Sequence, residues 1–214
     1  MDEELSIINS ETRKEKIKNF FIKNRKKIII IMSLLVLLVI IFFSYKTYQS
    51  NYQEKLANKY NSAVISFKDG EKLKAETALK EIVFDKDTTY SPLALYFLID
   101  NEMIKSKKEI NGLFDIIIEK TNLDNEIKYL NIYKKGLFNS DFENEENLLK
   151  ILDPIINSSS VWKSHALYLM GEYLYSKEKY DRAKDFFNQI LDLEDSNPKI
   201  KLQTEKKLQS DFNQ

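Results

Sequence analysis

The hydrophobic residues of this chain form one long uninterrupted run, followed by a series of shorter amphipathic segments. The long run covers residues 28–45, IIIIMSLLVLLVIIFFSY, and contains no charged residue. A bilayer core of roughly 30 Å needs about 20 apolar residues in a helix, and about 17 still suffice at little tilt. The pattern therefore predicts a transmembrane helix over 28–45.

A cleaved signal peptide is the main alternative for this run. The 27 residues that precede it are long for such a peptide, and Ser44-Tyr45-Lys46 offers no small-x-small cleavage site. A buried core helix would carry charges on one face, which residues 28–45 do not. We interpret the run as an uncleaved anchor.

The charges that flank the anchor predict its orientation. Residues 13–27 contain eight Lys/Arg, whereas residues 46–60 contain three. The positive-inside rule then places residues 1–27 in the cytoplasm as a basic tail and residues 46–214 across the membrane. The basic run could alternatively bind nucleic acid. Beside a span its topogenic role is favoured, together with attraction to anionic lipid.

Residues 46–214 show amphipathic segments separated by short polar breaks, which predicts a helical domain. Only four Gly and three Pro occur in the chain, fewer than sheets and tight hairpins usually need. Ser91-Pro92 and Ser196/Asn197-Pro198 each supply an N-cap followed by proline. The expected fold class is all-α, with helices over 46–67, 71–84, 91–106, 109–120, 125–138, 144–157, 161–177, 179–193 and 197–211.

The segment 161–193 has the clearest internal pattern, two helices that each present one packing face. Small residues at Gly171 and Ala183 would let the helices approach closely, while larger residues fill the space beside them. Two tyrosines, Tyr173 and Tyr175, lie outside the best stripe and are candidates for a binding groove. The predicted packing positions are Leu167, Met170, Gly171, Leu174, Tyr180, Ala183, Phe187 and Ile190.

This segment resembles a tetratricopeptide repeat (TPR), with Ile190 in place of the usual small residue and Pro198 about three positions late. Pro92 and Pro198 bracket three spacings of about 35 residues, near the period of such repeats. The resemblance implies a solenoid of degenerate TPR-like hairpins over 46–84, 91–120, 125–157 and 161–193. The middle two lack the Gly and Ala pattern, so an irregular helical bundle stays an alternative for them.

The arrangement of tail, single span and degenerate repeats resembles the TPR-like family of ancillary subunits of the SecYEG translocon (YfgM-type). The resemblance implies a single-pass protein of the bacterial inner membrane with a cytoplasmic N-terminus. It also implies a periplasmic domain that binds other proteins, namely the translocon, periplasmic chaperones or client proteins. A coordinator of cell division or of outer-membrane assembly with the same domain is the alternative.

Few residues in the chain are suited to catalysis. There is no cysteine, and His165 is the only histidine, so thiolate sites and histidine clusters are excluded. No phosphate-binding loop, dinucleotide fingerprint or zinc-protease motif occurs. Residues 28–214 carry a net charge of −3, which disfavours nucleic-acid binding. We expect no enzyme activity, cofactor, metal or small-molecule substrate; an enzyme without a recognisable motif is the alternative.

Overall fold

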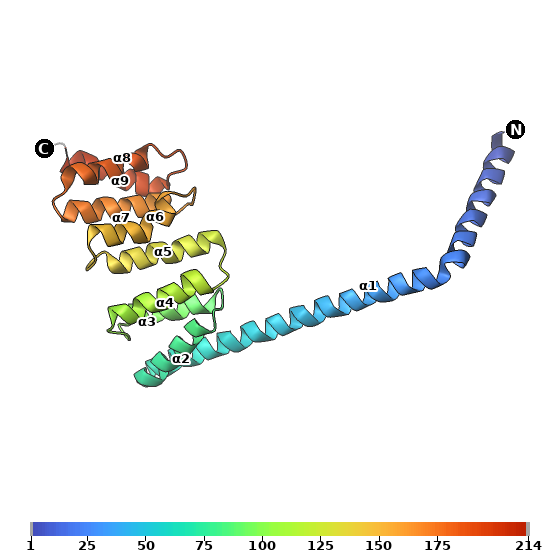
Figure 1. Ribbon diagram of the computed structural model, residues 1–214, viewed down its shortest axis with the longest axis horizontal. Coiled ribbons are helices and arrows are strands. Elements are labelled where there is room, and N and C mark those ends of the chain that lie inside the picture. The colour runs from blue at the N-terminus through green and yellow to red at the C-terminus, as the bar shows by residue number, and fades with distance from the viewer. Residues whose placement is uncertain (1, 213–214) are drawn as a thin grey trace. The chain divides into compact units, whose positions relative to one another are not determined.

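The computed structural model describes residues 2–212, and these are helical with no strand among them (Figure 1). By contacts between residues the chain divides into two compact units, one ending at Lys55 and one beginning at Leu56. The helices of the described residues are α1 (Asp2–Lys68), α2 (Lys72–Phe84), α3 (Tyr90–Asp100), α4 (Lys107–Lys120), α5 (Asn125–Asn139), α6 (Glu145–Ile156), α7 (Lys163–Ser176), α8 (Tyr180–Leu191) and α9 (Pro198–Asp211).

Helix α1 is one continuous helix and contains the predicted anchor. No Gly or Pro occurs before Gly70, so nothing in the sequence interrupts the helix, and the expected start of a separate helix at residue 46 is wrong. The side chains from Ile29 to Tyr45 are exposed. Among the described residues, α1 is the one helix long and apolar enough to cross a membrane.

Three helices end in the same hydrogen-bonded cap. At the end of α1, Gly70 has φ +88° and its amide donates to the carbonyl of Phe67 at 3.1 Å, while the Glu71 amide donates to that of Ser66 at 2.9 Å. Glu102 and Glu178 adopt the same left-handed conformation after α3 and α7, with φ of 49° and 59°. This pair of bonds is the Schellman motif, which satisfies the last carbonyls of a helix.

The cap at Glu102 corrects one predicted boundary. The expected helix 91–106 ends at Asp100, because the amides of Glu102 and Met103 turn back to the carbonyls of Ile99 and Leu98. The left-handed residue after a helix is usually glycine. Because glutamate takes this position here, no glycine marks the turn in the sequence.

One of the two predicted N-caps is confirmed and the other is wrong. The Asn197 side chain accepts from the amides of Lys199 and Ile200 at the start of α9, as expected. Ser91 lies inside α3, where its hydroxyl donates to the carbonyl of Ile82 at 2.6 Å. The amides that precede it are capped instead by the carboxylate of Asp87.

Most helices from α2 onward begin 35 residues after a corresponding earlier helix, whereas α6 and α7 begin 38 positions after α4 and α5. Helices α4, α5, α8 and α9 begin 35 positions after α2, α3, α6 and α7, respectively. Four fully buried side chains in successive even-numbered helices keep the same spacing: Ile82, Ile117, Leu152 and Phe187. Each helix from α2 packs against the next, and contacts also join α2 with α4, α5 with α7, and α7 with α9.

Hydrogen bonds join residues about one period apart. The Tyr96 hydroxyl donates to the Asn131 side chain at 2.7 Å, across 35 positions. Lys179 donates to Glu145 at 2.6 Å, and Ser160 donates to Glu126 at 2.7 Å, each across 34 positions. Positions that correspond in neighbouring hairpins therefore lie side by side.

Candidate protein-binding site

The predicted packing positions lie on α7 and α8, and all but one are buried. Gly171 faces the ring of Phe187, where an added Cβ would lie 2.5 Å from the nearest ring carbon. Tyr180 is the exception, because its side chain is 49% exposed and its ring packs edge-on against Tyr175. The buried positions are Leu167, Met170, Gly171, Leu174, Ala183, Phe187 and Ile190.

The expectation that the middle hairpins lack the Gly and Ala pattern holds only in part for α5 and α6, where Leu148 stands 35 positions before Ala183 but a glycine is present. Gly136 stands 35 positions before Gly171, and a Cβ there would clash with the side chain of Leu152. Leu152 in turn stands 35 positions before Phe187. The α5–α6 and α7–α8 hairpins therefore each contain the same kind of close contact. A glycine of the first helix faces a large side chain of the second, which is leucine in α6 and phenylalanine in α8.

The two groove candidates occupy different environments. Tyr173 is 7% exposed and its hydroxyl donates to the carbonyl of Glu143 at 3.0 Å, so it belongs to the core instead of an open groove. Tyr175 is partly exposed and contacts the ring of Phe212, with the Lys207 ammonium 4.2 Å from its ring centroid. Of the two, Tyr175 alone keeps surface for a partner.

His165 packs among aromatic rings. Its ring centroid lies 5.0 Å from that of Trp162 and 5.8 Å from that of Tyr133. Burial lowers the pKa of His165 below its ordinary value, so the imidazole is neutral at neutral pH. Among the residues whose side chains the structure describes, no group of three His, Asp or Glu is placed to hold a metal ion.

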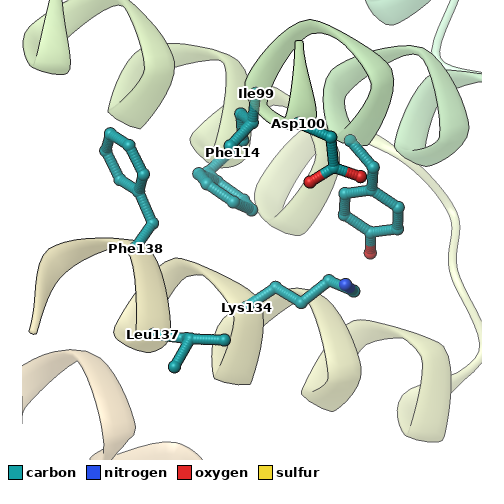
Figure 2. A pocket seen from close by; sticks show the side chains of 7 residues that line it. Ile99, Asp100, Phe114, Lys134, Leu137 and Phe138 are labelled. Carbon is teal, nitrogen blue, oxygen red and sulfur yellow. The ribbon is translucent and has the colours of Figure 1, made fainter. Parts of the chain in front are cut away.

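A pocket of about 220 Å³ lies between α3, α4 and α5, away from every residue that the sequence nominated (Figure 2). Helix α3 contributes residues at its C-terminal end, and α5 contributes three residues spaced so that they share a face. The lining consists of Tyr96, Ile99, Asp100, Phe114, Lys134, Leu137 and Phe138.

The pocket has an apolar side and a charged side. Figure 2 shows the rings of Phe114 and Phe138 on one side, and the charged ends of Lys134 and Asp100 on the other. Leu137 is 49% exposed, unlike the fully buried leucines of the core. Few polar groups on an otherwise apolar wall are typical of sites that orient a bound group.

The charged side of the pocket is held in place by Tyr96. The Lys134 ammonium lies 4.4 Å from the Tyr96 ring centroid, within the range of a cation–π interaction. The Tyr96 hydroxyl is fixed by its bond to Asn131, whose amide donates to the carbonyl of Ile127 at 2.8 Å. Burial raises the pKa of Tyr96, so the phenol stays protonated and donates this bond.

This volume is below the range of about 300–1,000 Å³ that holds most small ligands. An open, partly apolar pocket of this size is suited to one apolar side chain of another protein, as anchor residues at interfaces are.

Comparison with protein-family models, with curated proteins and with solved structures finds no match to this chain. Its function is therefore argued from its own residues.

The sequence held one signal for this pocket, the 35-residue spacing. Ile99 and Lys134 correspond in neighbouring helices, and Leu137 and Phe138 follow Lys134 at the i+3 and i+4 positions of the same face. The groove candidates Tyr173 and Tyr175 lie instead in the segment with the best repeat pattern, where Tyr173 is buried and Tyr175 only partly exposed.

Proposed function

We propose that this protein is a membrane-anchored scaffold, and that the helices from Leu56 onward form a solenoid of TPR-like hairpins that binds other proteins. The 35-residue register of Ile82, Ile117, Leu152 and Phe187 supports the solenoid, since repeats of one supersecondary unit bury a continuous core by stacking. The shared contact of Gly136 with Leu152 and of Gly171 with Phe187 supports it further.

The observation that carries a binding function is the pocket beside Leu137. Its apolar wall and single exposed leucine offer a place for an anchor side chain, with Lys134 and Asp100 beside it to orient a polar neighbour. No cluster of metal-binding side chains lies in the described part of the chain, and no catalytic motif occurs in the sequence. A scaffold therefore accounts for these features better than an enzyme does.

The location proposed for this scaffold is the bacterial inner membrane, with residues 46–214 in the periplasm. The resemblance of the whole arrangement to ancillary SecYEG subunits makes the translocon, a periplasmic chaperone or an emerging client the proposed partner. A coordinator of cell division or of outer-membrane assembly would use the same surface and differ in its partner.

A reporter that is active only outside the cytoplasm should work when fused after Gln214. The reason is the excess of Lys/Arg in residues 13–27 over residues 46–60. Alkaline phosphatase activity in intact cells measures this directly, with green fluorescent protein at the same position as the complementary reporter. Bright fluorescence together with an inactive phosphatase would contradict the topology.

Replacing Leu137 by aspartate should weaken partner binding by at least about tenfold, because it places a charge in an apolar contact. Leu202→Asp on α9 is the matched control, since the two leucines are 49% and 51% exposed. Co-purification from detergent-solubilised membranes, quantified by mass spectrometry of translocon subunits, measures the effect. Equal loss in both variants, or none in either, would argue against the pocket as the site.

A further inference from the structure

The helical segment before the predicted anchor, residues 13–27, carries both exposed cations and exposed apolar side chains. All eight Lys/Arg side chains of residues 13–27 are exposed, and Glu15 is the only acidic residue among them. In the described part of the chain none of these cations forms an ion pair. Phe20, Phe21 and Ile22 are 61%, 55% and 64% exposed.

The order of these residues along the helix is amphipathic. Phe20, Phe21 and Ile28 recur at helical spacing and fall on one stripe, with Asn24 between them. At 3.6 residues per turn, Lys16, Lys23 and Lys27 fall on one flank of the stripe, and Lys14, Lys18 and Arg25 fall on the other. Aromatic residues on one face with cations beside them are typical of helices that lie in the headgroup region of a membrane.

We propose that residues 13–27 bind the anionic lipid headgroups of the leaflet next to the span, with Phe20 and Phe21 inserted between them. This proposal rests on the membrane anchor of the proposed function. Each cation near an anionic surface strengthens binding roughly fivefold, and the covalent link to the span keeps the segment close to lipid at all times. Nucleic acid, the other polyanion that such a segment could bind, has no such link.

The test uses the full chain reconstituted in nanodiscs of phosphatidylcholine alone or mixed with phosphatidylglycerol. Hydrogen exchange of residues 13–27 should be at least about tenfold slower in the anionic discs. Raising the salt to about 1 M, where the Debye length is about 3 Å, should remove most of the difference. Equal exchange in the two lipid compositions would overturn the proposal.

Two variant pairs separate charge from apolar contact. Replacing Lys16, Lys18 and Lys23 together by glutamine should remove the lipid-dependent protection, since three cations contribute roughly a hundredfold. The control replaces the exposed Lys184, Lys199 and Lys206 in the same way and should leave it unchanged. Phe20→Ala should reduce the protection more than Ile22→Ala, because Ile22 lies off the stripe. The reverse order would contradict the proposed face.

Residues 28–45 in the same experiment report on the anchor itself. Protection of 28–45 in both lipid compositions, without any lipid dependence in 13–27, would overturn this inference and leave the anchor standing. Rapid exchange in 28–45 would overturn the anchor as well. If polyuridylate RNA slows exchange of 13–27 in neutral discs as much as anionic lipid does, the segment is a general polyanion binder and the proposal fails.

Discussion

Replacing Phe187 by alanine should lower the free energy of unfolding of the helical domain by about 3–5 kcal/mol. Phe187 is fully buried, and its ring lies against Gly171, which has no side chain that could fill the cavity. The rings of Tyr168 and Phe212 also pack against it, at centroid distances of 5.6 and 6.0 Å. Urea denaturation followed by the fluorescence of Trp162, the only tryptophan, measures the change.

The matched control for this substitution is Phe84→Ala. Phe84 is the last residue of α2 and is 57% exposed, so its removal should change the stability by no more than about 0.5 kcal/mol. A loss at Phe84 as large as the loss at Phe187 would show that burial in α8 does not decide the effect.

Replacing Gly171 by alanine should destabilise the domain by about 1–3 kcal/mol, the usual cost of overpacking. The new Cβ would lie 2.5 Å from the Phe187 ring, which is fully buried and in contact with the rings of Tyr168 and Phe212. Gly112→Ala in α4 is the control, because nothing lies within 4 Å of a Cβ there and its φ is not positive. That substitution should stabilise the helix by up to about 1 kcal/mol.

Combining Gly171→Ala with Phe187→Leu gives a second check on the same contact. Because the two residues touch, the double variant should lose less stability than the sum of the single losses. Strictly additive losses would mean that Gly171 and Phe187 do not form the contact at which the two helices approach most closely.

The helix pattern was predictable from the sequence because apolar residues recur at helical spacing and polar breaks separate the segments. The turns were less predictable. Gly70 indicates its turn in the sequence, whereas Glu102 and Glu178 adopt the same left-handed conformation without a glycine. Because nothing in the sequence marks the turn at Glu102, α3 ends earlier than expected. The 35-residue spacing is visible in the sequence between Pro92 and Pro198. Gly136 keeps this spacing with Gly171, but its partner is Leu152 instead of an aromatic residue, so it does not match the pattern of segment 161–193.

The binding surface was the least predictable part. Whether a tyrosine is buried or exposed depends on which residues of other helices cover it. The sequence around the tyrosine does not determine this. Tyr173 was a groove candidate, but residues of the preceding hairpin cover it and Glu143 accepts its hydroxyl. Leu137 had no distinguishing feature in the sequence, because its exposure depends on how α3, α4 and α5 pack around the pocket.

Site-specific photo-crosslinking in intact cells tests the central claim most directly. A photoreactive residue at position 137 should form covalent adducts with subunits of the translocon or with a periplasmic chaperone. The same residue at position 202, equally exposed in the native chain, should not form them. The absence of protein adducts at position 137, or the same adducts at both positions, would contradict a scaffold that binds its partner through this pocket.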